Sequence, residues 1–172
     1  LIDSAKNAGF DMFLIANNHS NDGLSQGFMR TMDVLSEKGV DYIGSRQSDS
    51  YKNYIVKDIN GIKIGMVNYT YGTISSDQVV AVNGILSTEE TSKLINVFDY
   101  NNLDSFYSKQ EQVIKNMKDD GAEAIVYYMH WGTEYLLDSS PQQKEIAQKL
   151  CDLGVDVIVG GHPHVVEPIE VL

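Results

Sequence analysis

Histidine is the residue of most chemical interest in this sequence, because a neutral imidazole is a common metal ligand and titrates near neutral pH. The 172 residues include only four histidines. Two of them stand on either side of one proline in the stretch GGHPHV, residues 160–165. Side chains two residues apart in an extended segment point to the same side. The sequence therefore predicts that His162 and His164 bind one metal cluster together.

All four histidines follow apolar runs that read as strands. His19 follows the run 11–16, His130 follows the run 124–129, and the paired histidines follow an apparently buried run, 155–159. Open α/β sheets bind ligands outside the carboxyl ends of their strands. We therefore expect the histidines at one edge of a sheet. Asn18 is a further candidate ligand, because an amide oxygen suits a hard divalent ion in a mixed nitrogen and oxygen site.

The polar neighbours of the histidines each have two interpretations. Asp22 can orient His19 as a carboxylate partner, or it can cap the helix that follows. Glu134 lies near His130 in the sequence, but a lone glutamate is most often a solvated surface group. A single histidine after a strand is also more often a loop residue than a ligand. It is the joint pattern that predicts a metal site.

Helical and strand-like patterns alternate through most of the chain. An Asn60-Gly61 pair between two apolar runs predicts a β-hairpin, residues 72–87 read as a surface loop, and Pro141 suits a first helical turn. Strands joined by helices favour an α/β fold with a mostly parallel sheet. The expected helices are 2–8, 24–38, 88–98, 103–119 and 141–153, and the expected strands are 11–16, 42–44, 54–59, 62–69, 124–129 and 155–159, with a last segment at 167–172.

Composition narrows the classes of function. Thirteen basic and twenty-four acidic side chains give a net charge of -11, and the basic residues are scattered singly, so we expect no nucleic-acid binding. The single Cys151 excludes an internal disulfide. No apolar run approaches the ~20 residues that span a bilayer. We expect one domain over residues 1–172. The opening LIDSAKNAGF has no initiator Met and reads as the inside of a helix, so we expect a piece of a longer protein.

Four motifs, in order, resemble those of the CapA-type capsule-synthesis proteins, which are bacterial poly-γ-glutamate biosynthesis proteins of the metallophosphatase-like superfamily. The match covers essentially the whole chain, and two of the motifs, HWGTEY and GHPH, are specific in combination. The motifs are ANNHSNDG (16–23), GIKIGMVNYTYGT (61–73), YMHWGTEY (128–135) and GGHPHVVEPIEVL (160–172).

The resemblance implies a calcineurin-like metallophosphoesterase sandwich: two sheets flanked by helices, with metal ions at the strand ends. It implies divalent ions (Mn, Fe, Zn or Mg), two of them in the intact protein. Asn18 matches the metal-binding Asn of the family, and His19 matches the histidine that assists the leaving group or steadies a phosphate oxygen. The matched metal ligands are Asn18, His130, His162 and His164, and the catalytic candidates are His19, Asp22 and Glu134.

One departure from the family pattern concerns acidic ligands. The family's Gly-Asp and Asn-Leu-Glu motifs are absent from this sequence, and we expect them upstream of it. Imidazole and amide ligands alone carry little negative charge, so this span by itself is expected to bind at most one ion tightly. Strands missing from the N-terminal side would leave a sheet edge open, and an open edge can pair with a second copy of the chain or with the detached N-terminal segment.

Two functions follow as hypotheses. The first is a metal-dependent hydrolase acting on a phosphoester. The second is a non-catalytic component of the cell envelope that assists synthesis, retention or export of an anionic polymer, through metal-bridged capture of carboxylates. A structural α/β domain with a decayed site would be favoured only if no metal bound. The resemblance also implies an extracytoplasmic, membrane-anchored full-length protein, with other capsule-synthesis membrane proteins as partners.

Overall fold

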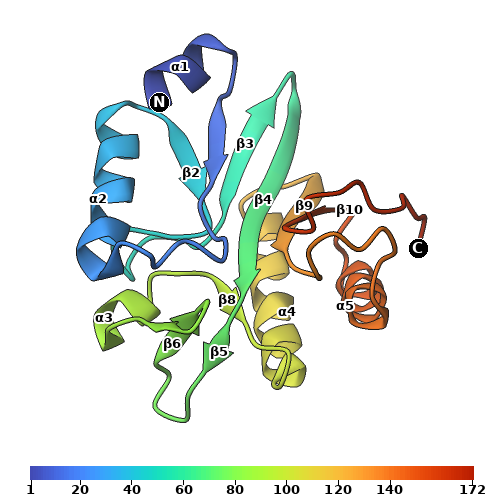
Figure 1. Ribbon diagram of the computed structural model, residues 1–172. Helices are drawn as coiled ribbons and strands as arrows, with labels where there is room; N and C mark the ends of the chain where they lie inside the picture. The colour runs from blue at the N-terminus through green and yellow to red at the C-terminus, as the bar shows by residue number, and fades with distance from the viewer.

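The computed structural model describes residues 1–172, in which helices and short sheets surround one long central strand (Figure 1). None of the helices combines the length and the apolar character needed to cross a membrane. The helices are α1 (Ile2–Asn7), α2 (Leu24–Glu37), α3 (Glu89–Ser92), α4 (Leu103–Asp119) and α5 (Pro141–Asp152). The strands are β1 (Met12–Leu14), β2 (Asp41–Ile43), β3 (Ile55–Ile59), β4 (Ile62–Tyr71), β5 (Thr73–Ile74), β6 (Val80–Val82), β7 (Ile85–Leu86), β8 (Val97–Phe98), β9 (Ala124–His130) and β10 (Val157–Gly161).

The largest sheet has the order β10-β9-β4-β3, and β8 pairs with the end of β4. Strands β8, β4, β9 and β10 are parallel, whereas β3 and β4 form the predicted antiparallel hairpin. The turn residues Asn60 and Gly61 have φ angles of 55° and 91°, the left-handed geometry that Asn-Gly turns favour. Parallel pairing places the carboxyl ends of β4, β9 and β10 at one edge.

Helices α4 and α5 cover one face of this sheet and form the main core with it (Figure 1). Large apolar and aromatic side chains from both layers are removed from water, which is the dominant stabilising contribution to such a fold. Tyr69 and Tyr127 stack across neighbouring strands at 6.1 Å between ring centroids, and Phe106 of α4 meets the Tyr69 ring edge-on. The predicted α4 and α5 are therefore confirmed, including Pro141 in the first turn of α5.

The parallel pair β1–β2 forms a second layer with α1 and α2. Hydrogen bonds of Asn68 join this layer to the central sheet. The buried Asn68 Oδ1 accepts a hydrogen bond from Ala16 N at 2.8 Å, and its Nδ2 donates one to Tyr128 O at 3.1 Å. Gly44 lies against this amide with a φ of +104°, and a Cβ there would sit 2.3 Å from Asn68 Oδ1. Only glycine fits that position, so the two layers meet closely just before the Asn18 loop.

Two predicted segments in the middle of the chain differ from the structure. Residues 72–87 are not one surface loop, because they form a small antiparallel sheet, β5-β6-β7. The predicted helix 88–98 is wrong beyond its first turn, since only Glu89–Ser92 is helical. Ile95 forms a bridge to Ser45, and β8 pairs with β4. Pairing with strands distant in sequence outweighs the local helical pattern here.

The strand expected at 155–159 is displaced and is not buried as predicted. Strand β10 runs from Val157 to Gly161 and is mostly exposed, and only Val155 before it is fully buried. As an edge strand it pairs only with β9. Residues 167–172 form no helix or strand. The predicted α/β class, with sheets flanked by helices, is confirmed, and it is consistent with part of a metallophosphoesterase-like fold.

Candidate metal centre

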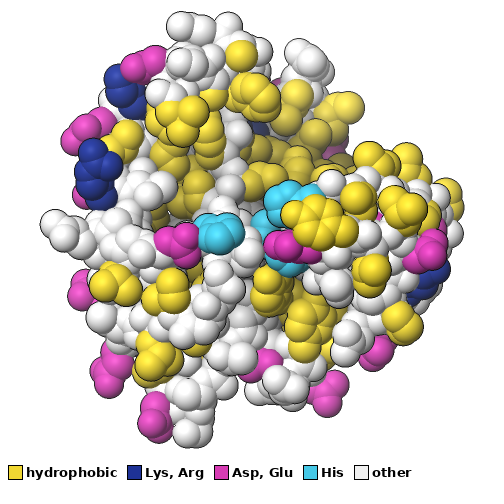
Figure 2. Space-filling model, in the orientation of Figure 1, with side chains coloured by type: hydrophobic (Ala, Val, Ile, Leu, Met, Phe, Trp, Pro, Cys, Tyr) yellow, Lys and Arg dark blue, Asp and Glu magenta, His cyan; other side chains and the backbone are white.

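The ends of β9 and β10 bring three histidines together on one face of the molecule (Figure 2). His130 is the last residue of β9 and lies opposite Gly161 of β10. The imidazole of His162, the next residue, is 4.9 Å from that of His130 between ring centroids, and His164 is 6.3 Å from His162. Three of the four histidines therefore meet at one sheet edge as predicted, whereas His19 follows β1, which belongs to a separate two-stranded sheet.

Two main-chain hydrogen bonds join the loop after β9 to the loop after β10. Trp131 N donates to Gly161 O at 3.1 Å, and Tyr135 N donates to Pro163 O at 2.7 Å. Because Glu134 directly precedes Tyr135, the second bond places Glu134 beside the paired histidines. Its Oε1 lies 3.8 Å from His164 Nε2. Side chains that are 28 to 30 residues apart in sequence are thus held together by backbone contacts.

Glu134, His162 and His164 form a group that fits a metal ion. Their candidate ligand atoms all lie within 4.8 Å of one another. His162 Nδ1 is buried without a hydrogen-bond partner, and an unpaired buried nitrogen is unfavourable unless a ligand satisfies it. One carboxylate and two imidazoles are a donor set that zinc, iron or manganese accepts. The prediction of a metal-binding group is thereby supported, while the identity of the ion stays a prediction.

Backbone strain is concentrated in the same two loops. Three residues other than glycine have left-handed φ angles there: Tyr135 at 64°, His162 at 96° and His164 at 59°. Such conformations cost of order 1–3 kcal/mol each and tend to cluster at ligand-binding sites. The strained residues thus include both of the paired histidines that were predicted to bind metal.

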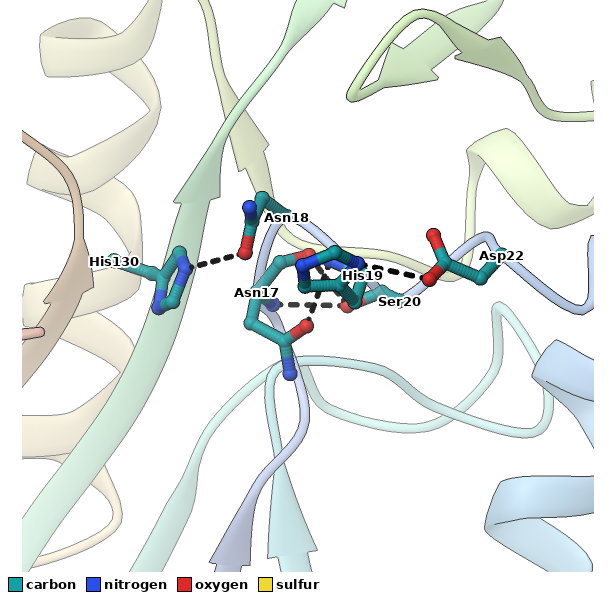
Figure 3. A network of polar contacts seen from close by, with 6 residues as sticks. All are labelled: Asn17, Asn18, His19, Ser20, Asp22 and His130. Atoms are coloured by element: carbon teal, nitrogen blue, oxygen red, sulfur yellow. Dashed lines mark hydrogen bonds and ion pairs between the residues drawn. The ribbon is translucent and has the colours of Figure 1, made fainter. Parts of the chain in front are cut away.

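Asn18 reaches the histidine cluster from the other layer (Figure 3). Its Oδ1 lies 2.9 Å from His130 Nε2. Burial, and then the neighbouring His162, lower the pKa of His130 to about 4, so its imidazole is neutral at physiological pH. The neutral ring is the form that binds metal ions. Asn18 and His130 are thus in contact beside the other histidines, and their role as ligands stays a prediction.

His19 and Asp22 form a separate, exposed pair. His19 Nδ1 lies 2.8 Å from Asp22 Oδ2, and Figure 3 shows this imidazole directed toward Asp22 while Asn18 is directed toward His130. The alternative interpretation of Asp22 as a helix cap is wrong, because the N-cap of α2 is Gly23 and no side chain caps it. The carboxylate therefore orients His19 as the first interpretation predicts.

Tyr71 belongs to the site but was not among the candidate site residues selected from the sequence. Its hydroxyl lies 3.3 Å from His162 Nε2, and its ring stacks against His130 at 6.4 Å between centroids. The available signal was its position at the carboxyl end of β4, the same edge that carries the histidines. Trp131, in contrast, is a buried packing residue.

Comparison with known proteins agrees with the resemblance seen in the motifs. The family model described as "Bacterial capsule synthesis protein PGA_cap" matches residues 1–172. The chain is 32% identical over 171 residues to "Capsule biosynthesis protein CapA" of Bacillus anthracis, a match covering 99% of this chain and 38% of that protein. It is 29% identical over 168 residues to "PGA biosynthesis protein CapA" of Bacillus subtilis (strain 168), covering 96% and 40%.

The chain therefore spans about 38 to 40% of the length of these curated relatives. The family match, in contrast, extends over the whole chain and includes every motif of the candidate site. The chain belongs to the family of bacterial capsule synthesis proteins.

Proposed function

We propose that this chain acts in the synthesis of a bacterial capsule polymer of the poly-γ-glutamate type, through a metal-dependent, phosphoesterase-like hydrolase site. The observation that carries the proposal is the group formed by Glu134, His162 and His164, whose ligand atoms lie within 4.8 Å of one another at the strand ends. The family match and the names of two relatives support the capsule context.

The metal ligands of this proposal are Asn18, His130, His162 and His164. Glu134 was predicted as a catalytic residue, but its closeness to the paired histidines favours a ligand role. A divalent ion held there supplies Lewis acidity and a water of lowered pKa. We propose Mn, Fe, Zn or Mg as the ion, with a second ion in the intact protein.

The protein's own proton donor is His19. Asp22 accepts a hydrogen bond from His19 Nδ1 at 2.8 Å, and the protonated ring carries a second N–H, at Nε2, that can point at a substrate. In phosphoester hydrolysis a water oxygen bonds to phosphorus and releases a proton to solvent, the ester P–O bond breaks, and the leaving oxygen takes the Nε2 proton. Asp22 thus acts by orienting His19, as a positioning residue.

The test is turnover of a panel of phosphoesters by the protein loaded with manganese or iron. The expected result is hydrolysis that falls at least ~100-fold in His162→Ala and by a similar factor in His19→Ala, in the range for loss of a general acid. The His19→Ala protein should still bind metal. Turnover no higher than in His162→Ala across the panel would count against the enzyme.

A second candidate is a non-catalytic envelope component that captures carboxylates of the polymer through the same metal. The observation that favours it is the small negative charge of the group, which has one carboxylate among its three side chains. A cation with few anionic ligands retains affinity for external anions. Polymer binding that persisted after chelation and in His164→Ala would contradict this candidate.

Location and partners form part of the proposal. A capsule lies outside the cell, so the capsule biosynthesis relatives favour the cell envelope, with a membrane anchor in the full-length protein. Other membrane proteins of capsule synthesis are the proposed partners. Fractionation of cells producing the full-length protein would test this, and recovery in the cytosol alone would contradict it.

A further inference from the structure

A cavity of about 470 Å³ lies apart from the histidine site, among β8, the β5–β6 turn and the first half of α4. None of the four histidines and no residue of the 130–135 loop lines it. Its volume lies within the range of small-molecule sites, which is roughly 300–1,000 Å³. The residues that decide its chemistry are Arg46, Lys93, Lys109, Asp49, Asp99 and Asn53.

The cavity is cationic in a strongly acidic protein. Three cationic and two anionic side chains line it, while the whole chain has a net charge of -11. The Asp99 carboxylate already accepts hydrogen bonds from Ile74 N at 2.9 Å and from Asn101 N at 2.8 Å. Neither Lys93 nor Lys109 takes part in an ion pair. Two ammonium groups are therefore free to meet an anion.

Arg46 provides a donor that the protein does not use. Its side chain is 17% exposed, and one of its terminal nitrogens donates to Asp49 at 2.7 Å. The Nε atom is buried and has no hydrogen-bond partner. A buried N–H without an acceptor costs free energy. Because this atom is shut off from solvent, a ligand in the cavity would meet the terminal guanidinium nitrogens instead. Arginine N–H groups match carboxylate oxygens well.

The amides that line the cavity do not compete for such a ligand. Asn96 donates to Asn53 O at 2.9 Å and to Asn68 O at 3.1 Å. Gln110 accepts from Tyr127 at 3.0 Å and donates to Phe106 O at 3.3 Å. These two buried amides are satisfied within the protein and offer no free donor to a ligand. The face that carries the histidines differs, because its Lys and Arg side chains lie at the margins, away from the histidines (Figure 2).

An adjoining cavity of about 350 Å³ shares Arg46 and Asn53 with the first. Its other charged side chains are Lys52, Asp119 and Asp120, and Lys52 is paired with Asp120. These two carboxylates disfavour an anion in the second cavity. The carboxylates of a ligand are therefore expected in the first cavity, which Lys93 and Lys109 line.

We propose that this cavity binds a short stretch of an oligomer bearing regularly spaced carboxylates, of the γ-glutamyl type, through Arg46, Lys93 and Lys109. The inference takes only the chemical class of the polymer from the proposed function. It adds a second site that needs no metal. This site would hold the oligomer while the histidine site acts on the oligomer or on a phosphoester of it.

The test measures binding of a short γ-linked glutamate oligomer by calorimetry, in low salt, with metal removed by chelation. The variant is Lys93→Gln/Lys109→Gln, whose side chains are exposed, so folding should be unaffected. The matched control is Arg30→Gln/Lys149→Gln, which makes the same change in net charge at exposed positions outside both cavities. Inorganic phosphate and glutamate are titrated separately.

The expected result is that the chelated protein binds the oligomer. The affinity should fall about tenfold or more in the Lys93/Lys109 variant and less than threefold in the control. Added salt should also weaken the binding. Arg46→Gln should weaken it further. No binding by the chelated protein, or equal weakening in the control, would overturn the proposal. Tighter binding of phosphate or of free glutamate than of the oligomer would also overturn it. None of these results depends on the metal site.

Discussion

At the scale of single residues, the site depends on a few close contacts that the side-chain types alone do not reveal. Two glycines precede the paired histidines, but their environments differ. A Cβ at Gly160 would lie 2.9 Å from the Trp131 indole nitrogen, whereas a Cβ at Gly161 has its nearest neighbour, His130 Nδ1, at 3.8 Å. Gly160 is therefore needed for packing under the site, and Gly161 tolerates a methyl group.

This difference predicts an asymmetric pair of substitutions. Gly160→Ala should lower the free energy of unfolding by about 1–3 kcal/mol, because the new methyl group overpacks against a buried indole. Gly161→Ala should change it by less than ~1 kcal/mol, since the contact is ordinary. Urea unfolding of both variants measures this. Equal effects would show that the indole contact does not constrain the loop.

Glu134 gives a prediction about metal affinity. Glu134→Gln should weaken metal binding about 10- to 100-fold, which is typical for loss of an oriented carboxylate at a metal site. The stability of the metal-free protein should change by less than ~0.5 kcal/mol, because the side chain is exposed. Glu145→Gln, on the exposed face of α5, is the control for charge, and competition titration is the measurement. Unchanged affinity in Glu134→Gln would remove Glu134 from the site.

At the scale of elements, the sequence predicted the long elements and the short strands β1 and β2, but it missed β5 to β8. The Asn60-Gly61 turn, α4 and α5 carry strong local signals, and all three are confirmed. The strands β5 to β8 are two or three residues long, which is too short for an alternating pattern to register. They exist because they pair with one another or with β4, which is tertiary information.

The same limit applies to the site. Residue types and strand ends were enough to select Asn18, His130, His162 and His164 from the sequence. The closeness of Glu134 to His164 could not be predicted, because it depends on the backbone bond between Tyr135 and Pro163 in two irregular loops. The roles of these side chains as ligands stay predictions until a metal is measured.

The joint between the layers predicts an effect on both stability and metal binding. Asn68→Ala should lower the free energy of unfolding by about 2–4 kcal/mol, because it leaves Ala16 N and Tyr128 O unpaired in a buried joint. Metal affinity should also fall, since Asn18 follows that joint directly. Asn116→Ala on α4, which pairs only with Gln112, should change stability by less than ~1 kcal/mol. Undiminished metal affinity in a folded Asn68→Ala protein would contradict the account.

At the scale of the whole molecule, the central sheet has an open edge at β10. Val157 and Val159 on this strand are 49% and 44% exposed, and no strand pairs with its outer side. Unpaired apolar edge strands favour pairing with another chain. The expected occupant is a second copy of this chain, which would place two histidine sites near one interface.

Light scattering of the purified chain tests that expectation. We expect a dimer at micromolar concentrations, and Val159→Lys should shift it to monomer, because an edge lysine disfavours strand pairing. Val166→Lys, at an exposed position outside the strand, should leave the dimer intact. A monomeric wild-type chain would contradict pairing through this edge.

The central claim is that the strand ends hold a metal ion through the paired histidines. Elemental analysis of the purified chain, beside His162→Ala/His164→Ala and His19→Ala, tests it most directly. The account predicts up to about one tightly bound ion per chain, lost in the double variant and retained in His19→Ala. Absence of metal from the wild-type chain, or equal metal in the double variant, would contradict it.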